Sequence, residues 1–157
     1  MLIDDLYEQV FNASPMGMAI IDRNHRVLRT NPAMDRINGR KTVPGEPGAQ
    51  VTPHIAETVR AYVDTVFQTK IAPEPVRLTG RNEARDGVPS QWHCAFTPIA
   101  AETGARVELC LAVITDLGTV ELDVDSVKQL NADSAQVAAA FADNVVPHPA
   151  VLTRTDA

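Results

Sequence analysis

The sequence predicts an α+β fold, because strand-like and helix-like segments occupy different stretches of the chain. Two strand-like segments joined by a polar turn stand near the N-terminus, and three more follow a long amphipathic helix. A further helical pattern precedes the C-terminus. With 157 residues and 45% apolar content, the chain has enough material for one core and too little for two ordinary domains.

Charge and composition argue against several classes of protein. The 20 acidic and 14 basic residues give a net charge of −6, and no cluster of Lys and Arg offers the cations that nucleic-acid phosphates need. No apolar run approaches the ~20 residues of a membrane span, and residues 1–5 do not resemble a signal peptide. We therefore expect a cytoplasmic protein without nucleic-acid or membrane partners, with Cys94 and Cys110 reduced.

An amphipathic helix is predicted at the N-terminus, where apolar residues recur at helical spacing until Ser14-Pro15. An apolar strand over 16–21, a tight turn and a strand over 26–30 then predict an antiparallel hairpin. Asn31-Pro32 predicts the N-cap and first position of a one- or two-turn helix. As a cap, the Asn31 side chain is expected to contribute ~1 kcal/mol to stability.

The middle of the chain predicts a loop and then a long helix. Asn38-Gly39 ends the short helix, and the Pro- and Gly-rich stretch to Gln50 predicts a mobile loop without regular structure. Thr52-Pro53 repeats the cap-and-proline signal at the start of a helix of roughly four turns. The apolar face of this helix consists of Ile55, Val59, Tyr62, Val63, Val66 and Phe67.

Three strands are predicted after the long helix, over 76–79, 91–99 and 107–114, with a polar loop over 81–89. On the second of these strands, Trp92, Cys94 and Phe96 fall on one side. The third contains an unbroken apolar run from Leu109 to Ile114, so we expect both of its faces to be covered.

The C-terminal region carries a heptad spacing, with steps of four and three residues. The positions are Val120, Val124, Val127, Asn131, Ser134, Ala138 and Phe141. Because Asn131 and Ser134 are polar, the pattern fits either one helix or two helices separated by a break.

Several short motifs follow one another in a fixed order: Phe11–Ala19, Asp22, Val27-Leu28, Asn31-Pro32-Ala33, Gly39, Trp92 with Pro98, and Val113-Ile114-Thr115-Asp116. With the order of the elements, they resemble a PAS domain, the small sensor module of bacterial signalling proteins. The resemblance covers residues 6–117. The closing motif departs from the family's Asp-Ile-Thr pattern, because its aspartate follows the threonine.

The resemblance implies a five-stranded antiparallel sheet with helices on one face and a ligand space between them. It also implies that a signal leaves through flanking helices. The corresponding division of the chain is a flanking helix over 1–14, a PAS core over 15–117, a signalling helix region over 118–144 and a disordered tail over 145–157.

No catalytic constellation is recognisable, and we expect the protein not to be an enzyme. The four histidines, His25, His54, His93 and His148, lack metal-ligand spacing. The chain also lacks a Gly-rich phosphate loop and a nucleophile elbow. No metal or cofactor is therefore expected.

Haem and flavin chemistry fit these residues poorly. In haem-binding PAS sensors the long helix supplies the axial histidine, and here only His54 is near, at the predicted helix start. The flavin-binding LOV branch needs a reactive cysteine near the helix after Asn38-Gly39, where neither cysteine lies. We expect a colourless protein.

A redox role for the cysteines is an alternative. If the last hairpin turns at Glu102–Gly104, Cys94 and Cys110 face each other and a bridge is geometrically conceivable. Two reduced thiols in the core are the simpler expectation.

The candidate ligand pocket combines the inward stripe of the long helix with strand residues. These candidates are Ile55, Val59, Tyr62, Val66, Trp92, Phe96, Leu109 and Leu111. Ordinary core packing is the competing interpretation for each of them. If a ligand binds, the apolar lining favours a small neutral or weakly polar molecule.

The leading functional hypothesis is a sensory or regulatory module that forms a homodimer and relays a signal to an output domain or partner signalling protein. The dimerisation candidates are apolar residues of the flanking helices: Leu2, Leu6, Val120, Val124 and Val127. One alternative is a PAS-type protein interaction domain with a filled core and no ligand. The other is a redox, haem or flavin sensor.

Overall fold

The structure is a computed structural model in which residues 2–53, 55–100, 106–121 and 124–144 are described. In chain order its elements are α1 (Ile3–Ala13), β1 (Gly17–Asp22), β2 (Arg26–Thr30), α2 (Pro32–Asn38), β3 (Glu46–Pro47), α3 (Gly48–Val51), α4 (Ala56–Thr69), β4 (Val76–Asn82), the 3-10 turn η1 (Glu83–Arg85), β5 (Val88–Ala100), β6 (Val107–Thr119) and α5 (Val124–Asn144).

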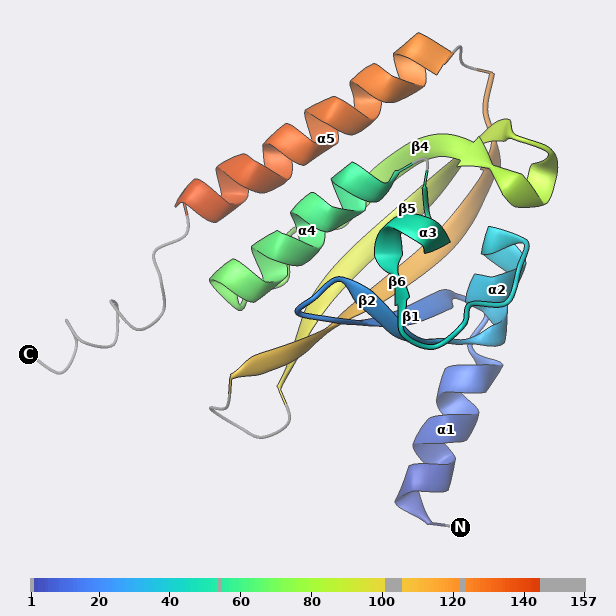
Figure 1. Cartoon of the computed structure of the whole chain (residues 1–157), viewed down its shortest axis with the longest axis vertical. Coiled ribbons are helices and arrows are strands. Elements are labelled where there is room, and N and C mark those ends of the chain that lie inside the picture. Colours follow the sequence, from blue (N-terminus) through green and yellow to red (C-terminus); the bar gives the residue numbers. More distant parts are fainter. Residues whose placement is uncertain (1, 54, 101–105, 122–123, 145–157) are drawn as a thin grey trace, which may run out of the picture.

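The strands form one antiparallel sheet in the order β3-β2-β1-β6-β5-β4, and α2, α3 and α4 lie over one face of it (Figure 1). This arrangement confirms the expected α+β class. The sheet has one strand more than expected, because the two-residue β3 pairs with β2 at Arg26 and Val27. The core lies between the sheet and α4, and its most buried large side chains include Val63, Val66 and Phe96.

The prediction that the stretch from Gly39 to Gln50 has no regular structure is wrong, because β3 and most of α3 lie within it. Arg40 donates two hydrogen bonds to the Glu46 carboxylate, at 2.9 and 2.6 Å, and the backbone N–H of Val43 donates a third at 2.6 Å. The bonds from Arg40 and Val43 lower the pKa of Glu46 to about 2. This polar cluster holds the chain in place where β3 and α3 begin.

The Thr52-Pro53 cap is also a wrong prediction, because α4 begins at Ala56 with Ile55 as its N-cap and no side-chain capping bond. Thr52 instead ends α3, since its backbone N–H donates to the carbonyl of Gly48 at 3.1 Å. The hydroxyl of Thr52 bonds the same carbonyl at 3.4 Å. A capping residue next to a proline therefore served the end of one helix rather than the start of the next.

Asn31 caps α2 as predicted, and it does more. Its side chain is fully buried, and its Oδ1 accepts hydrogen bonds from the backbone N–H groups of Met34 and Met18, both at 2.9 Å. Its Nδ2 donates to the backbone carbonyls of Phe11 and Met16, both at 3.0 Å. One amide thus joins the last turn of α1, the entry to β1 and the first turn of α2.

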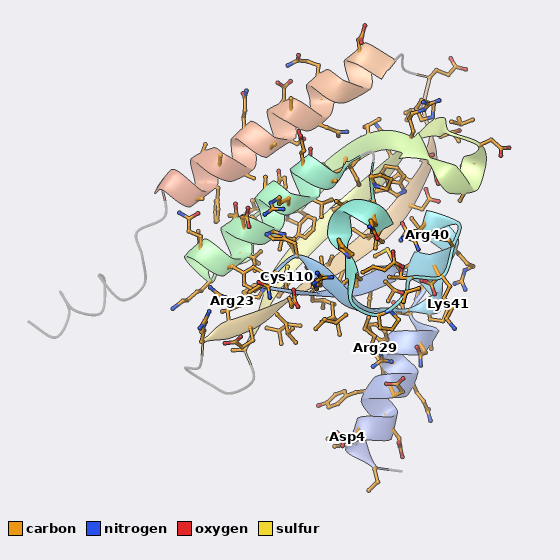
Figure 2. All side chains as sticks on the ribbon, in the orientation of Figure 1. Asp4, Arg23, Arg29, Arg40, Lys41 and Cys110 are labelled. Atoms are coloured by element: carbon orange, nitrogen blue, oxygen red, sulfur yellow. The ribbon has the colours of Figure 1, made fainter. Side chains whose placement is uncertain are left out.

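Helix α1 extends away from the sheet, and none of its residues is buried (Figure 1). Arg29 of β2 ties it down by an ion pair with Glu8 and by stacking over the Phe11 ring, with 4.5 Å from the guanidinium carbon to the ring centroid (Figure 2). The sheet face opposite the core is left half-buried and apolar. We call it the outer sheet face; it comprises Met18, Ile20, Ile99, Leu109, Leu111 and Val113.

Helix α5 is one continuous helix that runs beside α4 and β4 (Figure 1). The alternative of two helices is therefore excluded. Val120 precedes this helix, and its backbone N–H donates to the carbonyl of Pro89 at 2.8 Å. Two of the heptad positions in α5 are buried against the rest of the chain, Ala138 at 1% exposure and Asn131 at 8%.

The contacts of α5 are made through hydroxyl and amide groups as well as apolar atoms. Thr58 and Thr65 of α4 donate hydrogen bonds to the backbone carbonyls of Asn131 and Ala138, at 3.1 and 3.3 Å. The Asn131 side chain accepts from the backbone N–H of Thr79 at 3.2 Å and donates to the carbonyl of the same residue. Because β4 is an edge strand, the Asn131 side chain makes the hydrogen bonds that a neighbouring strand would otherwise make with Thr79.

We predict that Asn31→Ala lowers the free energy of unfolding by roughly 3 kcal/mol, more than an exposed N-cap would contribute. The substitution removes four hydrogen bonds from a site closed to water. Urea unfolding followed by circular dichroism measures the loss. Asn24→Ala, in the exposed turn between β1 and β2, is the control and should change stability by less than about 0.5 kcal/mol. Equal losses in the two variants would contradict the structural role of Asn31.

A second prediction concerns the attachment of α5. Asn131→Ala leaves the edge N–H and carbonyl of Thr79 without their partner, so amide hydrogen exchange at Thr79 should accelerate by at least tenfold. Gln129→Ala is the control, because Gln129 bonds only the exposed Asp133 within α5, at 2.9 Å. Unchanged exchange at Thr79 in Asn131→Ala would show that the amide does not hold the helix.

Candidate functional site

A cavity of about 100 Å³ lies between the sheet and the helices of its inner face. Strands β1, β5 and β6 form its floor, and α2, α3 and the start of α4 form its walls and roof. Its surface is mainly apolar. The polar side chains along it are Asn38, Thr52, Arg81 and Asn82, with the indole of Trp92.

Four of the predicted pocket residues line this cavity. They are Ile55, Val59, Trp92 and Phe96. Tyr62 and Val66 are not among the lining residues; they are buried in the core beside it, at 2% and 0% exposure. The Tyr62 ring stacks on Phe96 with 5.4 Å between the centroids, so Tyr62 supports the cavity wall from behind.

The structure places Leu109 and Leu111 on the outer sheet face, away from the cavity. Residues directly opposite in an antiparallel pair share a face, and β5 pairs with β6 so that Cys94 faces Ile114 and Phe96 faces Ala112. Even-numbered residues of β6 therefore lie on the same inner face of the sheet as Cys94 and Phe96 of β5. Partners across most of this hairpin are both even-numbered or both odd-numbered, and this rule could have identified Ala112 and Ile114 from the sequence.

Several lining residues had no signal in the sequence. Val51 and Thr52 reach the cavity from α3 and its end, directly after the stretch to Gln50 that was expected to be a loop. Met34, Ile37 and Asn38 reach it from α2, whose brief apolar face gave no indication of which element it would contact. These contributions depend on how the short helices fold over the sheet.

Two hydrogen-bond donors at this cavity have no partner among the described residues: the indole Nε1 of Trp92 and the side-chain Nδ2 of Asn38. Trp92 is 6% exposed, so water from the bulk does not reach its N–H. A buried donor without an acceptor costs about 1–3 kcal/mol, and such groups are rare in folded proteins. The cavity is therefore polar at two points and apolar elsewhere.

Cys94 and Cys110 do not face each other, so that prediction is wrong. In the observed register Cys94 is opposite Ile114, whereas Cys110 is opposite Pro98. The four-residue offset along β6 corresponds to about 13 Å at ~3.3 Å per residue, which is too far for a disulfide. Both thiols are free and buried, with Cys110 in the core beneath the helices (Figure 2).

Burial also makes these thiols poor nucleophiles. Removal from water raises the pKa of both Cys94 and Cys110 to about 12. At neutral pH the reactive thiolate is therefore nearly absent.

Among the described residues, no group of three or more His, Cys, Asp and Glu side chains could hold a metal ion. His25 bonds Asp64 at 2.7 Å. His54 and His148 lie outside the described residues.

Arg85 of η1 makes a two-bond ion pair with Asp116 of β6, at 3.1 and 2.7 Å, which secures the β4–β5 connection.

Of the dimerisation candidates, Leu2 and Leu6 are 75% and 46% exposed on α1. Val120 is half-buried in the link before α5. The side chains of Val124 and Val127 lie outside the described residues. Across the part of the chain that the structure describes, no helix has the length and apolar character to cross a membrane.

A family model described as the PAS fold matches residues 11–121. No curated protein matches the sequence. Among solved structures, a PAS domain from Colwellia psychrerythraea has 15% identity and a TM-score of 0.59, over 74% of this chain and 98% of that one. The Rhodobacter sphaeroides LOV protein has 15% identity and a TM-score of 0.57, over 90% and 96%.

A third structure of this kind is Vibrio cholerae VqmA, solved as a complex with ligand and DNA. The identity is 15% and the TM-score 0.58, over 74% of this chain and 52% of the VqmA chain. This chain therefore spans about half the length of VqmA. At these identities the three structures are evidence for the fold.

We predict that neither cysteine reacts with a thiol reagent in the folded protein at pH 8 within an hour, whereas both react in urea. The mass of protein kept in air should equal that of reduced protein, because the offset between the thiols prevents a bridge. Intact mass spectrometry measures both quantities. A loss of two hydrogens on exposure to air would restore the redox interpretation.

Proposed function

Because the chain belongs to the PAS fold family, we propose that it is a non-enzymatic sensory module that binds a small ligand in the cavity and relays the binding event through α5. The proposal divides the chain into the flanking helix 1–14, the sensing core 15–117, the signalling helix region 118–144 and the tail 145–157. The tail lies outside the described residues.

The observation that carries this proposal is the position of α4 between the cavity and α5. Val59 of α4 lines the cavity, while Thr58 and Thr65 bond the backbone of α5. Packed elements move as rigid units rather than deforming continuously. A ligand that shifts α4 therefore changes the packing of α5 directly, and α5 is the last helix that the structure describes.

We further propose a homodimer built on α1 and the outer sheet face. The α1 helix exposes an apolar stripe that includes Leu2, Leu6 and Tyr7. Together with the half-buried residues of the outer sheet face, this stripe makes an apolar surface of the kind that marks an interface. In the described part of the α5 seam, Asn131 and Ala138 are engaged within the chain, so the proposed contribution of this region to the dimer comes from Val120, Val124 and Val127 near its start.

The receiver of the signal is proposed to be an output domain or a partner signalling protein in the cytoplasm. A net charge of −6 without a basic cluster disfavours direct contact with nucleic acid. It likewise disfavours an acidic membrane surface.

One alternative is a protein interaction domain that binds no ligand, and it is favoured by the small size of the cavity. A haem or flavin sensor is the other alternative. The cavity volume of about 100 Å³ opposes it, because a prosthetic group of that size needs more space. Burial of the thiols also opposes a reactive cysteine beside a flavin, since it raises the pKa of Cys94 to about 12.

Native mass spectrometry and an absorbance spectrum of freshly purified protein separate these functions. We expect a dimer mass, a bound small molecule in part of the population and no visible absorbance. A Soret band or flavin spectrum at near-stoichiometric level would identify a cofactor sensor. Protein without any adduct, which also fails to bind members of a metabolite library, would favour the interaction domain.

The same spectra test the dimer surface. Leu6→Glu places a charge in the apolar stripe of α1 and should convert the dimer to monomer at micromolar concentration. Asn12→Asp adds the same charge on the polar side of α1 and should leave the dimer intact. A Leu6→Glu protein that remained dimeric would exclude this stripe from the interface.

A further inference from the structure

The unpartnered donors at the cavity indicate what kind of molecule it accepts. Trp92 Nε1 and Asn38 Nδ2 are two of three buried side-chain polar atoms without a partner in the described part of the chain, and both residues line the same cavity. A hydrogen-bond acceptor placed there would satisfy donors that the fold leaves open. An apolar ligand would leave them unsatisfied, at a cost of about 1–3 kcal/mol each.

Both donors are held in position by close backbone packing. Trp92 lies against Gly80, where an added Cβ would stand 3.2 Å from the ring atom Cζ3 and 2.8 Å from Ile55. Asn38 ends α2, and Gly39 after it has a φ of 72°, which turns the chain close against Ala84. The Trp92 indole and the backbone that carries Asn38 are therefore fixed by their neighbours, which lowers the entropic cost of recognition.

The remaining lining describes the rest of the ligand. Around the donors the wall is formed by aliphatic side chains such as Ile21, Ile37 and Val59. No carboxylate of the described residues lines the cavity, so a cation would lack a partner there. A guanidinium along it belongs to Arg81, an exposed residue whose Nε donates to the carbonyl of Gly87 at 3.4 Å.

We propose that the cavity selects a small uncharged molecule that carries a hydrogen-bond acceptor, such as a ketone or amide oxygen, and that Trp92 Nε1 and Asn38 Nδ2 recognise this acceptor. The inference rests on the proposed function, because it assumes that the cavity is the sensing site. A cavity of about 150 Å³ holds benzene in another protein, so about 100 Å³ suits a molecule of a single small ring or less.

Three probes with the same small ring test the proposal on the full chain: cyclobutanone, methylcyclobutane and cyclobutanecarboxylate. Trp92 is the only tryptophan, so its indole N–H gives one resonance in a nitrogen-15 correlation spectrum. We expect cyclobutanone to shift that resonance downfield and to bind about tenfold more tightly than methylcyclobutane, since one satisfied donor contributes roughly that factor. The carboxylate should bind weakest.

Variants assign the preference to the donor. Trp92→Phe should still bind methylcyclobutane and should lose the tighter binding of cyclobutanone, as measured by changes in the resonances of the lining methyl groups. Tyr62→Phe is the matched control, because it removes a polar group from a buried ring that does not line the cavity. It should preserve the tenfold preference.

The outcomes separate this inference from the proposed function. Equal affinity for cyclobutanone and methylcyclobutane, or an unchanged preference in Trp92→Phe, overturns recognition by the donors while the cavity still binds ligands. Tightest binding of the carboxylate overturns the uncharged class and assigns Arg81 as the countercharge. If none of the probes binds, both the inference and the ligand-binding function are wrong.

Discussion

The fully buried side chain of Asn31 is the interaction on which the arrangement of the N-terminal half depends. An amide has an acceptor oxygen and a two-proton donor, and here it serves four backbone groups from α1, β1 and α2 at once. These groups stand where the chain passes from helix to strand and from strand to helix, so no ladder pairs them. The same amide therefore sets where α2 lies on the sheet, and α2 forms one wall of the cavity.

A second asparagine, Asn131, forms hydrogen bonds with the edge strand at the other end of the sheet. The backbone of β4 is open at the edge, and Asn131 of α5 pairs with both groups of Thr79. The helix is attached by these polar contacts as well as by the buried Ala138. A flanking helix held in this way is suited to reporting a movement of α4, because α4 supplies the hydroxyl groups that bond it.

The cavity differs from ordinary core packing by its chemistry more than by its size. Most of its wall would serve any hydrophobic core, and Tyr62, Val66 and Phe96 show how closely such a core is packed next to it. Trp92 and Asn38 break this pattern, because a core without a ligand gains nothing from two unsatisfied donors.

The sequence by itself determined the local elements: the Asn31 cap before Pro32, the hairpin of β1 and β2, and the amphipathic α4 each follow from neighbouring residues. Tertiary structure decided the rest. The β5–β6 register separated Cys94 from Cys110 and turned Leu109 outward, because loop length and bulges set register. Asn131 resembled a helix break because its partner, Thr79, is distant along the chain. The cavity walls likewise bring together residues from distant segments of the chain, which no local sequence pattern relates.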